Sequence, residues 1–152
     1  EYILKRGNVT EPDSLDPHKA TGTWENNIIG DIFLGLVTES AIGNIIPGSA
    51  RDWKISDDGR EYTFYIREEM LWSDGMPVTA NDFAFALKRI INPATASQYA
   101  SLLFTIKNAQ EINKGELNID DLGVEALDAK TLKISLRRPV PFFIQLLSHY
   151  TT

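Results

Sequence analysis

The chain has 152 residues, with 15 Lys and Arg against 21 Asp and Glu, which gives a formal net charge of −6 at pH 7. This length suits one domain with a hydrophobic core, and a negative charge without a basic block makes nucleic acid and anionic membranes poor partners. No apolar run approaches the ~20 residues that a membrane-spanning helix needs. Because the chain contains no cysteine, it offers no disulfide, thiolate metal ligand or cysteine nucleophile.

In chain order, the first predicted elements are a short strand over 2–6 and a helix over 24–34. Thr23 is expected to cap this helix at its N-terminus, and Gly35 is expected to end it. A hairpin is predicted over 37–46, where two short apolar runs flank a Gly-Asn pair. These elements would be joined by short loops.

A turn and a half-buried strand are predicted next. The Asp-Gly pair at 58–59 favours a chain reversal, because glycine reaches positive φ at no steric cost and aspartate tolerates it. The strand covers 62–67, since Tyr62, Phe64 and Ile66 share one parity and polar residues occupy most of the other. One face of this strand should therefore be buried.

A capped helix follows over 80–91. Thr79 precedes the helical pattern and Asp82 comes three residues later, so the pair can satisfy free N–H groups and favour the positive end of the helix. Apolar residues recur at i, i+4, i+7 and i+8 from Phe83. The helix should end before Pro93, because the residue before a proline avoids the α region.

The C-terminal third is predicted to combine helices with a hairpin. Helical spacing indicates helices over 95–104, 108–114 and 142–147, and the hairpin pairs strands over 122–127 and 131–136. Aromatic residues that fall at strand or helix periods are assigned to core packing: Trp53, Tyr62, Phe64, Trp72, Phe83 and Phe85.

The histidines and acidic residues do not have the spacing that catalysis or metal binding requires. His18 and His149 are the only histidines and lack the spacing of a zinc site, so each is expected at the surface. The acidic pairs at 57–58 and 120–121 could act as general acid and base or bind a hard cation, but turns favour aspartate for backbone reasons. No cofactor or metal is therefore expected, and a hydrolase remains a distant alternative.

Four short motifs follow one another through the centre of the chain. They are Ala-x-x-Trp from Ala50, Ser-x-Asp-Gly from Ser56, Tyr-Thr-Phe-x-Ile-Arg from Tyr62, and Trp-Ser-Asp-Gly-x-Pro-Val-Thr-Ala-x-Asp from Trp72. This run resembles the signature of the solute-binding proteins of peptide and nickel ABC importers, the dipeptide and oligopeptide-binding family. The resemblance covers nearly the whole chain and is greatest to the oligopeptide binders.

The resemblance implies a fold and a function. The fold is α/β with an α+β small lobe, the N-terminal part of a two-lobed periplasmic-binding-protein-like (type II) fold. Residues 1–34 would belong to the large discontinuous lobe and 35–152 would form the small lobe. The chain would be an N-terminal fragment of a non-enzymatic protein that captures oligopeptides for ABC permease subunits, in the periplasm or as a cell-surface lipoprotein of a Gram-positive host. A same-family binder of nickel, haem, glutathione or another non-peptide ligand is the alternative.

The resemblance also implies binding residues. In this family, the segment formed here by Thr21, Gly22 and Thr23 lies at the cleft between the lobes and pairs with the peptide main chain like an added strand. Tyr99 approaches the ligand from the small lobe. Main-chain pairing suits a binder of many sequences, since every peptide carries the same N–H and C=O pattern. For Tyr99, the alternative is a buried helix residue that packs beside Leu102 and Leu103.

Overall fold

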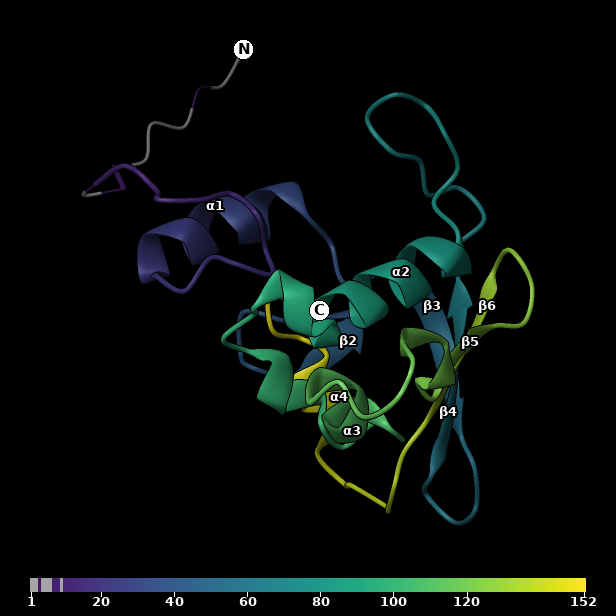
Figure 1. Ribbon diagram of the computed structural model, residues 1–152. Helices are drawn as coiled ribbons and strands as arrows, with labels where there is room; N and C mark the ends of the chain where they lie inside the picture. Colours follow the sequence, from purple (N-terminus) through teal and green to yellow (C-terminus); the bar gives the residue numbers. More distant parts are fainter. Residues whose placement is uncertain (1–2, 4–6, 9) are drawn as a thin grey trace.

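The computed structural model describes residues 3, 7–8 and 10–152, and its centre is a four-stranded antiparallel sheet of order β3-β4-β6-β5. The strands are β3 (Ala50–Ile55), β4 (Glu61–Ile66), β5 (Val124–Ala126) and β6 (Thr131–Ser135), and a separate hairpin pairs β1 (Val37–Glu39) with β2 (Ile45–Pro47). The α-helices are α1 (Thr23–Ile32), α2 (Ala80–Ile91), α3 (Ala109–Asn113) and α4 (Phe143–Leu146). In Figure 1, α2 lies beside the sheet, whereas α1 and the opening loop lie at one side of the molecule.

Two further predictions concern the N-terminal strand and membrane-spanning helices. The predicted strand over 2–6 lies outside the described residues, apart from Ile3. Among the residues that the structure does describe, no helix is both long and apolar enough to cross a membrane.

The hairpin β3-β4 confirms the predicted turn and strand. Gly59 has a φ of 68°, a left-handed value that glycine adopts without strain, and Trp53 faces Phe64 across the two strands. Tyr62, Phe64 and Ile66 are buried. Because these three alternate along β4, one face of the sheet meets the core, as the sequence predicts.

Helix α2 packs against the sheet and has the predicted bounds. The Asp82 carboxylate accepts the Thr79 backbone N–H at 2.7 Å, the contact expected of a capping box. Leu87, Ile90 and Ile91 are buried on one side of the helix. Burial of each such side chain contributes about 1.5–3 kcal/mol, so this packing holds α2 firmly in place.

The predicted helix over 95–104 is wrong. The structure has two short 3₁₀ helices in this region, Pro93–Thr95 and Ala100–Leu103. Ala96 lies between them with a left-handed φ of 54°, a conformation that a right-handed helix cannot include. Tyr99 therefore lies at the end of an irregular loop and not inside an α-helix.

Helix α1 begins one residue earlier than predicted and ends earlier. Gly22 is its N-cap in place of Thr23, and the helix stops at Ile32, before Gly35 is reached. A Cβ at position 22 would collide with the Glu25 carboxylate, so the acidic group occupies the space that a capping side chain would need. The other short elements, β1-β2, β5-β6, α3 and α4, agree with the prediction to within about two residues at each end.

The aromatic core is smaller than predicted. Four of the assigned side chains are buried or pack against the core: Trp53, Tyr62, Phe64 and Phe83. Trp72 and Phe85 are instead 43% and 68% exposed. Phe85 lies on the side of α2 opposite Leu87, and Trp72 lies in the connection between β4 and α2, so neither faces the sheet.

Candidate functional site

The predicted binding residues meet where the opening loop enters α1. The Tyr99 hydroxyl donates a hydrogen bond to the Thr21 carbonyl at 3.2 Å, although the two residues are 78 positions apart. Gly22 and Thr23 follow as the N-cap and the first residue of α1. The structure thus brings the four residues into one region, and their role in binding a ligand stays a prediction.

Two aromatic residues that the sequence reasoning did not select complete this region. The Tyr150 hydroxyl donates to the Ala20 carbonyl at 2.9 Å. Its ring stacks on that of His149 with centroids 4.5 Å apart, and it meets Tyr99 edge-on at 5.9 Å. We call residues 20–23, Tyr99, His149 and Tyr150 the seam. No motif or periodicity marks His149 or Tyr150, because only the fold brings the C-terminal segment onto the opening loop.

Burial shifts the pKa values of two side chains in the seam. It raises the pKa of the Tyr150 phenol, with further contributions from Tyr99 and Glu25, and it lowers the pKa of the His149 imidazole. Both shifts arise because a low-dielectric environment disfavours the charged form of a group. At neutral pH, Tyr150 is therefore a hydroxyl donor and His149 is an uncharged ring. His149 is partly buried, not fully at the surface as expected.

Glu25 places a carboxylate beside the seam, in the first turn of α1. Only 4% of the residue is exposed, and its Oε1 accepts the Asp13 backbone N–H at 3.0 Å. That hydrogen bond is the main cause of a lowered pKa of the Glu25 carboxyl, so the group is ionised at neutral pH. The second oxygen, Oε2, is buried and has no hydrogen-bond partner among the described residues.

A polar cluster joins the opening loop to α2. Arg89 donates to Asp16 Oδ1 at 2.7 Å, and its guanidinium lies 2.8 Å from His18 Nδ1. The hydrogen bond from Arg89 lowers the pKa of Asp16 to about 2, while burial and then the Arg89 charge lower the pKa of His18. The expected surface position of His18 is wrong, since it is 5% exposed. Arg89 reaches from α2 to both residues and keeps the loop against the helix.

Asp57 and Asp58 are turn residues, as the sequence suggests, whereas Asp120 and Asp121 lie in a short 3₁₀ helix, Ile119–Asp121. Asp58 accepts the Ser56 hydroxyl at 2.6 Å and the Arg60 N–H at 3.1 Å, and Asp121 accepts the Asn118 N–H at 3.2 Å. Across the described part of the chain, no three His, Cys, Asp or Glu side chains are placed to hold a metal ion. These carboxylates stabilise local backbone conformations and form no acid–base pair with the seam.

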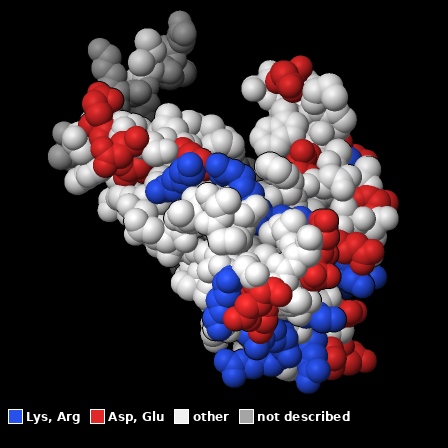
Figure 2. All heavy atoms as spheres, viewed as in Figure 1, with Lys and Arg blue, Asp and Glu red and all other residues white. Residues whose placement is uncertain are grey.

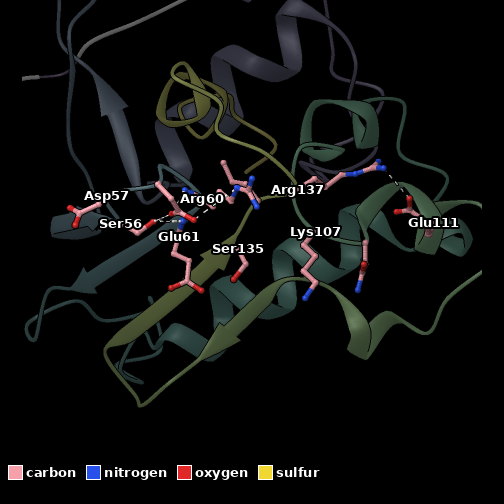
Figure 3. Close-up of a pocket in the computed structure, with 11 residues that line it drawn as sticks. Ser56, Asp57, Arg60, Glu61, Lys107, Glu111, Ser135 and Arg137 are labelled. Carbon is pink, nitrogen blue, oxygen red and sulfur yellow. Dashed lines mark hydrogen bonds and ion pairs between the residues drawn. The ribbon is translucent and has the colours of Figure 1, made fainter.

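A polar hollow of about 770 Å³ lies away from the seam. Figure 3 shows side chains of both charges along it, with Arg137 directed toward Glu111, an ion pair of 3.3 Å. None of the predicted binding residues lines this hollow. A second hollow, of about 490 Å³, adjoins the seam at Tyr150, and its lining is mainly apolar and includes Trp72 and Phe85.

Comparisons with known proteins agree on one family. Residues 44–152 match the family model for bacterial extracellular solute-binding proteins, family 5, middle region. The chain is 46% identical to the periplasmic murein peptide-binding protein MppA of Escherichia coli over 92% of this chain, and 45% identical to the periplasmic oligopeptide-binding protein OppA of that organism over 100% of it. It is also 37% identical, over 97% of its length, to the probable deoxycholate-binding periplasmic protein YgiS of Escherichia coli. The chain spans only 26–28% of the length of these relatives.

Solved structures give the same result. The crystal structure of Haemophilus influenzae OppA in complex with the peptide RPPGFSPFR superposes with a TM-score of 0.91 at 42% identity, covering 95% of this chain and 28% of that chain. The unliganded open form of the periplasmic murein tripeptide-binding protein MppA gives 0.89 at 46% identity, covering 93% and 28%. The mixed α/β fold expected from the sequence, as part of a longer binding protein, is confirmed.

Proposed function

Because this chain belongs to the bacterial extracellular solute-binding proteins, family 5, we propose that it captures oligopeptides for the permease subunits of an ABC importer. The printed names of two curated relatives, a murein peptide binder and an oligopeptide binder, support a peptide ligand. Both names place those relatives in the periplasm, and the same compartment, or the cell surface of a Gram-positive host, suits this protein. Its role is to bind and deliver a solute, not to catalyse a reaction.

The seam is the proposed binding region, and it lies where the two proposed lobes of the chain meet. Residues 1–34 contribute to the large lobe and 35–152 form the small lobe. Two contacts across this division are the hydrogen bonds from Tyr99 to Thr21 and from Tyr150 to Ala20. A guest that enters between the lobes would meet both sides, so its extra contacts in the closed state would favour lobe closure.

The observation that carries this proposal is the exposed main chain at Thr21. Its carbonyl faces Tyr99, and its N–H donates to no other described residue. A free N–H on an exposed residue is what an added strand needs from the chain, and peptides of any sequence supply the complementary carbonyl. Side chains of the guest can then remain in wet pockets that do not discriminate strongly.

Two substitutions at one position test this proposal. Thr21→Pro removes the N–H while Thr21→Ala keeps it, and both remove the hydroxyl. Titration calorimetry of the full-length protein with tri- to pentapeptides is expected to show a loss of at least about tenfold for Thr21→Pro and little change for Thr21→Ala. Equal affinity of the two variants would contradict main-chain pairing at Thr21. Failure of the unaltered protein to bind any peptide would contradict the peptide ligand itself.

A non-peptide ligand is the second candidate, and one relative favours it specifically. YgiS, whose printed name is a probable deoxycholate binder, is 37% identical to this chain. The apolar hollow beside Tyr150 suits part of an amphipathic molecule of that kind. Mass spectrometry of the ligand that copurifies with the protein distinguishes a peptide from deoxycholate, and also from nickel, haem or glutathione.

A further inference from the structure

The apolar hollow of about 490 Å³ beside Tyr150 exposes an unusual number of large apolar side chains. Six that line it are each at least 43% exposed: Ile32, Phe33, Leu34, Leu71, Trp72 and Phe85. Single apolar residues at a surface are ordinary, but a group of them around one concave site marks a contact surface, because apolar area left in water is costly. The apolar hollow therefore needs a partner.

The apolar hollow is formed by segments that are far apart in the sequence. They are the end of α1 with the residues that follow it, the connection between β4 and α2, and the side of α2 that carries Phe85 and Arg89, away from Leu87. The connection projects from the body of the protein at the upper right of Figure 1. Figure 2 shows a notch between this projection and α1, and the projecting side of the notch is mainly white, which means uncharged.

The polar groups of the lining already have partners within the chain. Asp82 accepts the Thr79 backbone N–H at 2.7 Å, and Arg89 donates to Asp16 at 2.7 Å. The Tyr150 hydroxyl is bonded to the opening loop. A partner of the hollow is therefore not needed to satisfy these polar groups, and the contacts that remain to be made are apolar. An apolar surface is the chemistry that fits, since a buried polar group without a hydrogen bond would be costly there.

The length of the relatives indicates that this partner is more of the same protein. The chain spans only 26–28% of MppA and OppA of Escherichia coli, so most of a protein of this family lies outside it. Thr151 and Thr152 line the apolar hollow. The Thr152 carbonyl lies 3.1 Å from the position that a Cβ on Gly35 would take, beside the proposed boundary between the lobes. In a full-length protein, the chain that leaves Thr152 therefore starts at the edge of the hollow.

We propose that the apolar hollow is an internal interface of the full-length protein, covered by apolar side chains from the part of the large lobe that follows Thr152. The inference rests on the lobe division given under the proposed function and adds a contact that joins α1, α2 and the rest of the large lobe. Because the protein itself supplies the cover, the contact is present with or without a guest. A site for a guest or for a second copy of the protein would instead be covered only when that partner is bound.

Hydroxyl-radical footprinting of the full-length protein, read by mass spectrometry, measures whether Phe85 is covered. The rate of each residue is divided by its rate in the urea-unfolded protein. Phe142 is the matched control, because Phe85 and Phe142 are 68% and 57% exposed in this structure. Folding is expected to slow the reaction of Phe85 at least about fivefold and that of Phe142 less than about twofold. Phe85→Ala should also lower the melting temperature of the full-length protein more than Phe142→Ala does, since only Phe85 would lose contacts with the cover.

The conditions under which Phe85 is protected identify the occupant, and this measurement needs no variant that folds. Cover by the chain itself predicts the same protection at about 1 μM and about 100 μM protein, with or without saturating trialanine or deoxycholate. Protection that appears only with one of these ligands would overturn the proposal and make the hollow a guest site. Protection only at the higher protein concentration would assign it to a second copy, and a Phe85 that reacts as fast as Phe142 throughout would leave it uncovered. Peptide affinity does not enter this comparison, so failure to bind peptide would contradict the proposed function alone.

Discussion

The ion pair between Asp16 and Arg89 makes the stability of the protein depend on pH, and Asp16→Asn measures its contribution. Arg89 extends from α2 and donates to the Asp16 carboxylate on the opening loop at 2.7 Å. Replacing Asp16 by asparagine keeps the size of the side chain but removes its charge. The partly buried Arg89 then loses its counter-ion, and the loop loses its ion pair with α2.

The expected size follows from the pKa of Asp16, which Arg89 lowers from 3.8 to about 2. A shift of this size corresponds to about 2.5 kcal/mol at full strength. Because 26% of the Asp16 side chain is exposed, solvent screening reduces the expected contribution to about 1–2 kcal/mol. The pKa is lower in the folded state, so this stability is present above pH 3.8 and is lost as the pH falls toward 2.

Urea denaturation followed by tryptophan fluorescence gives the measurement. At about pH 7, Asp16→Asn is expected to lower the free energy of unfolding by about 1–2 kcal/mol, and the difference from the unaltered protein should shrink as the pH is lowered from about 4 to about 2.5. Asp57→Asn, at an exposed turn position, is the matched control and should change little at any pH. A difference that stays constant down to about pH 2.5, or that is absent at about pH 7, would refute the assigned role of the ion pair.

Three further predictions concern stability. Burial lowers the pKa of His18, so as the pH falls below about 6.5 the histidine of the unfolded chain takes up a proton before that of the folded protein. The folded protein therefore loses stability between about pH 7 and pH 5, and His18→Gln should flatten this loss in the same urea titration. Lys130 Nζ donates to the carbonyls of Arg67 and Val78 at 3.0 Å, and Lys130→Met is expected to cost about 2–4 kcal/mol in chemical denaturation. Ala96 has a φ of 54°, and Ala96→Gly should raise the free energy of unfolding by about 0.5–1 kcal/mol, seen as a higher melting temperature; a lower one would argue against strain at this residue.

Local signals in the sequence account for the elements that were predicted well. Gly59 marks the β3-β4 turn through its backbone freedom, and Thr79 with Asp82 marks the start of α2 through cap chemistry. Both depend on residues within a few positions of one another. Ala96 has no such signal, because alanine favours helices and only its surroundings hold it in a left-handed conformation. The predicted helix over 95–104 failed for that reason.

The candidate site was predictable only in part, because its members come from distant segments. The resemblance to a family selected Thr21–Thr23 and Tyr99, and the structure brings Tyr99 onto Thr21. His149 and Tyr150 were not selected, since no pattern links the C-terminal segment to the opening loop. The burial of His18 was missed for the same reason, because Arg89 lies 71 positions further along the chain. Contacts of this kind follow from topology and not from local propensity.

Residue-resolved amide hydrogen exchange in the full-length protein, with and without a saturating oligopeptide, tests most directly whether a guest is held by the main chain of the seam. The account predicts that the peptide slows exchange of the Thr21 amide by at least about tenfold, since that N–H becomes a donor to the guest. The amide of Ile42, at the exposed tip of the β1-β2 hairpin, should be unaffected. Unchanged exchange at Thr21 in a protein that demonstrably holds its peptide would contradict the account.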